Sequence, residues 1–207
     1  MTDGGGYGIL RVEVNEKEAI IMTNTTVVRS TAAPRLSVKA QTLAALAAIA
    51  AAVAVPQIFH LLGAISGLGA ALGETFLPMH LPILLVGLLA GPWAGAAAGL
   101  LGPLCSFALS GMPGAVMLPF MMAELGAYGL FAGLMRRTSL PVFVQVLTVQ
   151  IAGRAVRAGA ILLGVYAFGS PVAVNTIWMS SVIGVFGIVL QWALLPLLVY
   201  RVEDRTK

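Results

Sequence analysis

Three charged residues lie inside long apolar stretches of the sequence, where a charge is costly unless it faces a cavity or a partner. Glu124 lies near the middle of one stretch, and Arg154 and Arg157 lie three residues apart in another, on one face of a helix. One carboxylate and two guanidinium groups leave one positive charge over. If Glu124 pairs with one arginine, the other can bind an anionic ligand, and a guanidinium suits a carboxylate because it donates two parallel hydrogen bonds.

A purely structural explanation of these charges stays open, because both arginines could make internal contacts and Arg157 could extend to the outer membrane interface. Further candidates for substrate binding are Asn175 and Trp178, near the outer end of the last apolar stretch, and His80, which follows a glycine-rich segment. A tryptophan at such a depth is often only an interface anchor. A histidine in such a position more often makes hydrogen bonds within the protein or lies at the membrane interface than contacts a ligand.

The sequence contains little that could catalyse a reaction. The segment 63–67 does not match the G-x-S-x-G nucleophile motif, and no aspartate lies between Ala40 and Tyr200 to form an aspartyl dyad. H-E-x-x-H and P-loop motifs are absent, and a single cysteine, Cys105, excludes a disulfide framework. We therefore expect no enzyme activity, no cofactor or metal, and no ATP hydrolysis by this chain itself.

The composition is that of a membrane protein. Of 207 residues, 59% are hydrophobic and 10% are charged, against about 25% charged residues in soluble domains. Only six charged residues lie between Ala40 and Tyr200, too few to cover a soluble surface. The basic residues flank apolar stretches and form no stripe with aromatic residues, so the net charge of +4 does not indicate nucleic-acid binding. These features predict an all-α polytopic protein embedded in a lipid bilayer.

The apolar stretches predict six transmembrane helices. Gly91-Pro92 divides the stretch 80–110 into two helices, because proline cannot continue a helical hydrogen-bond ladder and glycine tolerates a turn. The resulting second and third helices are short for a bilayer that needs about 20 residues per crossing. The other predicted spans are 40–62, 115–135, 141–168 and 174–200.

The distribution of basic residues predicts the orientation. Basic residues occur in the tails 1–39 and 201–207 and at Arg136-Arg137, whereas the connections 63–79, 111–114 and 169–173 contain none. Since loops rich in lysine and arginine stay in the cytoplasm, we expect both tails to be cytoplasmic. The expected organisation is a largely disordered N-terminal tail (1–39), a transmembrane substrate-binding domain (40–200) and a short C-terminal tail (201–207).

Small residues recur at every fourth position in two helices, on faces that let another helix approach closely. The glycine row is Gly87, Gly91, Gly95 and Gly99, for which packing inside the bundle is the favoured interpretation. The other row could pack within the chain or against a partner protein, and consists of Ala40, Ala44, Ala48 and Ala52.

Three segments together resemble the substrate-binding S components of energy-coupling factor (ECF) vitamin transporters. They are MHLPILLVGLLAGPWAG at 79–95, GMP at 111–113 and LPFMMAELGAYG at 118–129. The resemblance covers about 40–200 and implies a vitamin pocket near the outer face of a bacterial inner membrane, gated by residues 63–79. It also implies docking on a transmembrane T component with two cytoplasmic ATPase subunits, through the row Ala40, Ala44, Ala48 and Ala52.

Within that resemblance, the central segments look most like the branch associated with pantothenate, a carboxylate, and the surplus arginine agrees with this substrate. Hydroxymethylpyrimidine, folate and other vitamins stay open. The alternative from another class is a stand-alone channel or facilitator, which predicts a continuous polar row through several helices. The polar residues gather toward the outer half instead, which favours a binding subunit.

Overall fold

The computed structural model describes residues 36–205, and every regular element in that part of the chain is a helix. Six helical segments are long and apolar enough to cross a membrane. The prediction of an all-α protein with six spans is therefore confirmed. The helices are α2 (Val38–Ser66), α3 (Ala71–Phe76), α4 (His80–Ala90), α5 (Pro92–Ser110), α6 (Leu118–Met135), α7 (Val142–Phe168), α8 (Thr176–Ile183) and α9 (Val185–Arg205).

Glycine and proline mark most of the helix boundaries, as their backbone preferences require. Gly91 has a φ of 107° and separates the 11 residues of α4 from the 19 of α5, which begins at Pro92. The predicted break at Gly91-Pro92 is thus confirmed. Gly111 and Gly169 adopt positive φ at the ends of α5 and α7, and the Ser37 hydroxyl accepts a hydrogen bond from the Ala40 amide at the start of α2.

Two predicted segments differ from the structure in detail. The segment 63–79, expected as a loop, contains the last turn of α2 and the short helix α3. The last predicted span, 174–200, is interrupted at Gly184, so that α8 and α9 are separate helices. A close approach to α3 explains why glycines occur here, since a methyl group on Gly187 would lie 2.6 Å from the Phe76 carbonyl oxygen.

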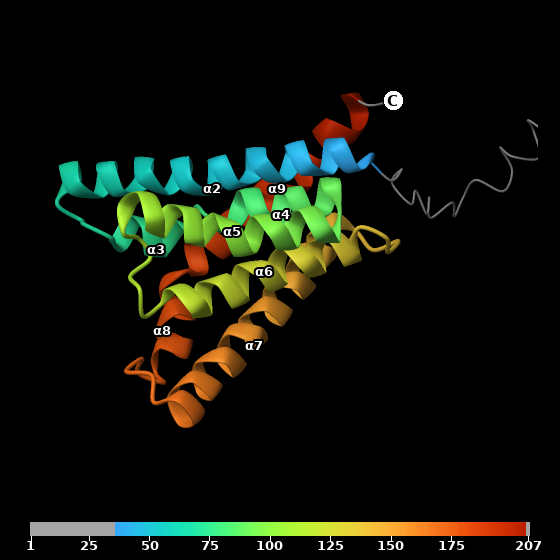
Figure 1. Ribbon diagram of the computed structural model, residues 1–207. Coiled ribbons are helices and arrows are strands. Elements are labelled where there is room, and N and C mark those ends of the chain that lie inside the picture. Colours follow the sequence, from blue (N-terminus) through green and yellow to red (C-terminus); the bar gives the residue numbers. More distant parts are fainter. Residues whose placement is uncertain (1–35, 206–207) are drawn as a thin grey trace, which may run out of the picture. The chain divides into compact units, whose positions relative to one another are not determined.

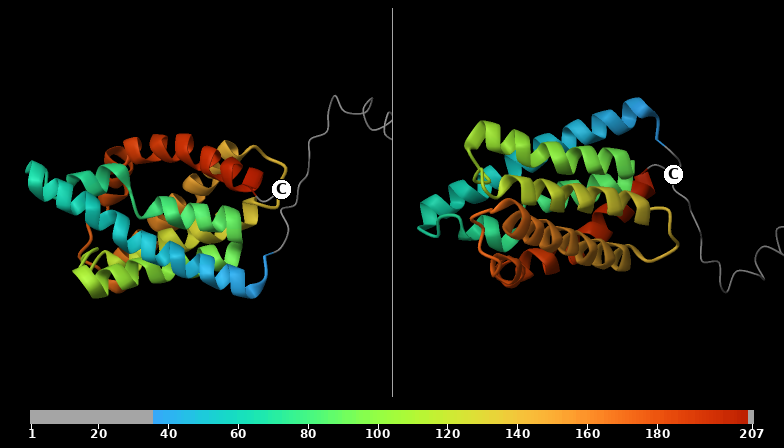
Figure 2. Two further views of the ribbon diagram at one scale, coloured as in Figure 1. Left: turned by 90° about the horizontal axis from the view of Figure 1, so that it is seen from above. Right: turned by 60° about the horizontal axis from the view of Figure 1, so that its bottom comes forward.

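The two predicted tails fall mostly or partly outside the described residues. Most of the tail 1–39 lies outside them, and α2 begins at Val38. At the other end α9 continues to Arg205, so residues 201–205, expected as tail, are helical. The start of α2, the α6–α7 connection and the end of α9 lie at one end of the bundle, whereas α3 and α8 lie at the other (Figures 1 and 2).

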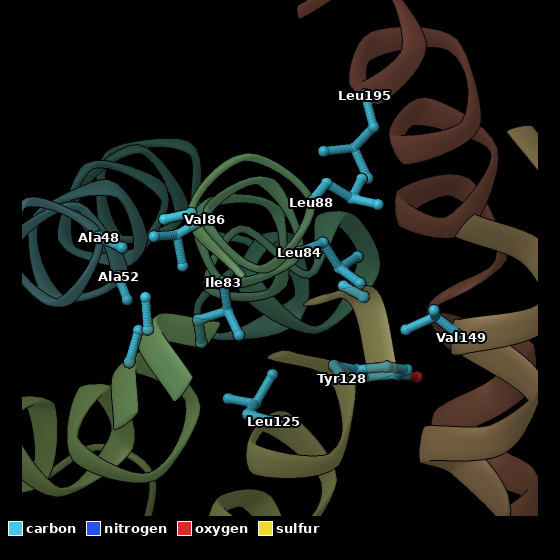
Figure 3. Close-up of a cluster of buried hydrophobic side chains, with 14 of the residues drawn as sticks. Ala48, Ala52, Ile83, Leu84, Val86, Leu88, Leu125, Tyr128, Val149 and Leu195 are labelled. Atoms are coloured by element: carbon cyan, nitrogen blue, oxygen red, sulfur yellow. The ribbon is translucent and has the colours of Figure 1, made fainter. Parts of the chain in front are cut away.

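Buried side chains of several helices form the core around α4 and α6. Ile83 and Leu84 on α4, Leu125 on α6 and Leu195 on α9 have no exposed surface, and the close-up shows them converging with Tyr128 and Val149 (Figure 3). Gly87, Gly95 and Gly99 of the glycine row pack internally, whereas Gly91 forms the break between α4 and α5 and has open space around it. A methyl group on Gly95 would collide with the backbone of Gly129, and one on Gly99 with the Leu125 carbonyl group.

The alanine row of α2, for which the resemblance implied a docking role, packs partly inside the chain. Ala48 and Ala52 are only 5% and 0% exposed, and they face Val86 and Ile83 of α4 (Figure 3). Ala40 and Ala44 are half-buried. A partner cannot contact Ala48 or Ala52 in this conformation, because α4 and α5 already use the close approach that small side chains permit.

Candidate binding cavity

A cavity of about 510 Å³ is lined by residues from every helix from α2 to α8, at the end of the bundle where α3 and α8 are found. This volume is typical of sites for small organic ligands. Five methionines contribute to a mostly apolar lining that can adapt to the shape of a ligand. They are Met79, Met112, Met117, Met121 and Met179.

The polar part of the cavity wall is built around a buried carboxylate. Glu124 on α6 has no exposed surface, and its Oε2 accepts a hydrogen bond of 2.9 Å from Nη1 of Arg157 on α7. The Tyr128 hydroxyl donates to Oε1 at 3.3 Å, and His80 Nε2 lies 3.9 Å from the same oxygen. Glu124 therefore pairs with Arg157, one of the two pairings that the sequence left open.

Two cavity-lining side chains in this cluster carry polar atoms that are not used within the described residues. Both ring nitrogens of His80 and Nε of Arg157 are buried without a hydrogen-bond partner. The His80 ring is 4% exposed and packs edge-on against Tyr128, with ring centroids 5.3 Å apart. Since buried polar atoms are normally satisfied, these nitrogens suit a ligand that brings hydrogen-bonding groups into the cavity.

A second polar network extends from this cluster toward α3. Gln150 on α7 donates from Nε2 to Oε1 of Gln191 on α9 at 2.8 Å, and the Trp192 indole donates to Gln150. Gln191 Nε2 donates to the Leu77 carbonyl oxygen, which follows α3, at 3.4 Å. The Tyr128 hydroxyl contacts the Gln150 carbonyl oxygen at 3.4 Å, so the network connects the charged cluster with the segment that borders the cavity.

The structure brings together half of the six substrate-binding residues expected from the sequence. His80, Arg157 and Asn175 line the cavity, and Glu124 lies behind Arg157. The two others are not part of the lining. Arg154 instead donates from Nη1 to the Ser181 hydroxyl at 2.9 Å, and Trp178 is 75% exposed on the outer side of α8.

Several lining residues were not among the sequence candidates for substrate binding. The methionines carry no positional pattern that could have been recognised, because they come from different helices and connections. Glu74 and His60 were visible only as polar residues flanking a glycine-rich segment. The remaining polar ones come from α5 and α8 and are Ser106, Thr176 and Ser180. Among the described residues, no cluster of three or more His, Cys, Asp or Glu side chains could hold a metal ion.

Comparison with known protein families gives one match. The family model for the substrate-specific component of ECF transporters matches residues 38–200. The chain belongs to this family. No curated protein and no solved structure matches the sequence.

Membership in the S component family assigns the chain to a transporter and not to an enzyme family. The match covers α2 to α9 almost completely, so it includes all helices that form the cavity. An S component binds a small-molecule substrate and associates with T and ATPase subunits. The chain is accordingly a multi-pass membrane protein, with six helical segments suited to crossing the bilayer.

Proposed function

We propose that this S component captures a vitamin or vitamin precursor that carries a carboxylate, with pantothenate favoured, for uptake driven by a T component and two ATPase subunits. The observation that carries the proposal is the pair of unsatisfied donors at the cavity wall, on Arg157 and His80. A carboxylate offers two acceptor oxygens, and hydrogen bonds from a guanidinium to a carboxylate are strong and directional.

The ion pair between Arg157 and Glu124 affects how a carboxylate substrate would bind. The ion pair removes the net charge, so the substrate would be held by oriented donors more than by a free cation. The described hydrogen bond of Arg157 uses only Nη1, which leaves the other guanidinium nitrogens for a ligand. Asn175, Thr176 and Ser180 line the α8 side of the cavity and are suited to the hydroxyl and amide groups of pantothenate.

The same geometry argues against a stand-alone channel. A channel needs a continuous polar path, whereas the helices beyond the charged cluster are filled with buried apolar side chains such as Leu84, Val149 and Leu195. A closed apolar core beneath a polar cavity is what a binding subunit requires, since substrate must be held until partners move it.

Mass spectrometry of the small molecules released from the purified protein would identify the substrate without assuming it. We expect a carboxylate-bearing vitamin. Proteoliposomes that contain this chain alone should bind the labelled vitamin but should not accumulate it inside. Adding the T component and ATPases with ATP should produce accumulation. Accumulation by the chain alone would contradict the binding-subunit proposal, and release of a substrate with no acidic group would contradict the carboxylate assignment.

We also propose that α2 contacts the T component through the side that the bundle leaves exposed. Ala47, Ala50 and Ala54 are exposed, and they are flanked by exposed apolar residues such as Leu43 and Ile58. Small side chains on an exposed apolar helix permit close packing against a helix of another protein. This face replaces the buried Ala48 and Ala52 in the docking proposal.

A further inference from the structure

Helix α8 forms one wall of the cavity but is weakly anchored to the rest of the bundle. It contributes Thr176, Met179, Ser180 and Ile183 to the cavity lining. None of its eight residues is buried. The non-helical segment 169–175 precedes it, and Gly184 separates it from α9. A short helix with non-helical residues at both ends can move as a unit.

Arg154 makes a side-chain hydrogen bond between this helix and α7, in addition to the apolar packing of Ile177 against Phe120 and Ile161. Its Nη1 donates to the Ser181 hydroxyl at 2.9 Å, and this hydroxyl donates in turn to the Ile177 carbonyl oxygen at 3.1 Å. Among the described residues, no other side-chain hydrogen bond connects α8 with another helix. The guanidinium also lies beside the interruption that follows α8, because a methyl group on Gly184 would be 3.3 Å from Nη2 of Arg154.

The chemistry of this contact is that of a hydrogen bond that can break and re-form. Within the described residues Arg154 has no carboxylate within 4.0 Å, and its Nε is buried without a hydrogen-bond partner. The acceptor described for this guanidinium is a neutral hydroxyl group, so no ion pair among the described residues fixes its position. The contact connects a firmly packed helix with a loosely packed one.

We propose that Arg154 is a positioning residue whose hydrogen bond to Ser181 holds α8 in place and keeps the cavity closed on the α8 side, with Gly184 as the hinge. This inference concerns access to the cavity and does not depend on which substrate the cavity binds. A hydrogen bond from a charged donor shifts such an equilibrium by roughly tenfold or more, so its loss should raise the open population by that factor.

Cavity access can be measured with a cysteine in the part of the cavity wall that α5 contributes. Ser106 on α5 lines the cavity and is 1% exposed, and Cys105→Ala removes the single native thiol. In a protein carrying Cys105→Ala and Ser106→Cys, the rate of reaction with a small water-soluble methanethiosulfonate reports how often the cavity opens. We expect Arg154→Ala and Ser181→Ala each to accelerate labelling roughly tenfold.

The double variant makes the test specific for this one bond. Arg154→Ala combined with Ser181→Ala should label no faster than either single variant, because both changes remove the same interaction. Arg154→Lys, which can still donate to Ser181, should restore most of the slow labelling. Thr148→Ala is the matched control, since that hydroxyl bonds only within α7, to the Val144 carbonyl oxygen, and its removal should change the rate little.

An unchanged labelling rate in folded Ser181→Ala protein would overturn the proposal, and so would additive effects of the two changes. Ser181→Ala deletes only a hydroxyl group, so it carries the test even if Arg154→Ala fails to fold. Thermal unfolding checks folding of every variant. Because the readout uses no substrate, failure to find a bound vitamin would contradict the proposed function and leave this result unaffected.

Discussion

Glu124 determines how the charges at the cavity are arranged. A carboxylate without exposed surface needs a cationic or hydrogen-bonding partner, and Arg157 and Tyr128 supply both. The surplus positive charge counted from the sequence therefore belongs to Arg154, which contacts Ser181 and not the cavity. Recognition of an anionic substrate would thus rest on the unsatisfied nitrogens of Arg157 and His80.

Arg157→Met should abolish substrate binding and also destabilise the protein. It leaves Glu124 buried without its cationic partner, which costs about 3–5 kcal/mol. Adding Glu124→Gln should restore most of the stability, since the buried charge is then gone, but it should not restore binding. Thermal unfolding and equilibrium binding of the identified vitamin check the two effects, and normal binding by the double variant would show that the ion pair is only structural.

His80→Phe separates recognition from packing at the same cluster. The phenyl ring can retain the edge-on contact with Tyr128 while removing two buried nitrogens that have no hydrogen-bond partner among the described residues, of which Nε2 lies 3.9 Å from Glu124 Oε1. We expect the affinity for substrate to fall about tenfold, which corresponds to about 1.4 kcal/mol. The unfolding temperature should stay equal or rise, because unsatisfied buried polar atoms are costly. Unchanged affinity would remove His80 from the binding site.

At the scale of helices, α2 has one face packed inside the bundle and one exposed face. One face packs on α4 and α5 through Ala48 and Ala52, and the other carries the exposed Ala47, Ala50 and Ala54. Both faces consist of small residues, because alanine is so frequent in this helix. Only contacts with the neighbouring helices distinguish the internal face from the one available to the T component.

Ala50→Trp should block assembly with the T component and ATPases but leave substrate binding intact, because a large side chain prevents close approach of another helix without entering the bundle. Ala155→Trp on α7 is the matched control, since Ala155 is also an exposed helical alanine, and it should leave assembly unchanged. Co-purification of the complex in detergent measures the effect. Normal recovery with Ala50→Trp would exclude this face of α2.

At the scale of the whole described bundle, the cavity and the basic residues that follow α6 lie at opposite ends. The cavity lies at the end with α3 and α8, and Arg136 and Arg137 lie at the end where α2 starts and α9 finishes. Between the two ends lies a core of mostly apolar buried side chains. The bundle can therefore present a binding site on one side of a membrane and its charged ends on the other.

Labelling from outside the cell tests the orientation that the basic residues predict. In a Cys105→Ala background, Ala173→Cys in the connection between α7 and α8 should react with a membrane-impermeant thiol reagent on intact cells. Thr138→Cys, in the connection after α6, should react only after the membrane is opened, because the positive-inside rule predicts a cytoplasmic position for a loop that carries Arg136 and Arg137. The reverse pattern would contradict cytoplasmic termini.

The sequence by itself determined the class and the number of spans, because apolar length, the Gly91-Pro92 break and the sparse charges are local properties. It also singled out His80, Arg157 and Asn175, which line the cavity, and Glu124, which pairs with Arg157, since polar groups in apolar surroundings are conspicuous. The family resemblance noted from three segments agrees with the match over 38–200.

Only the tertiary structure decided which arginine pairs with Glu124, which face of α2 is buried, and that Trp178 lies outside the cavity. Arg154 and Arg157 share one helix face, and so do the alanines of the row, so spacing along the chain cannot distinguish their neighbours. The partner of each side chain depends on how α6, α7 and α8 are arranged around it. That arrangement follows from the packing of all helices together and not from any single one.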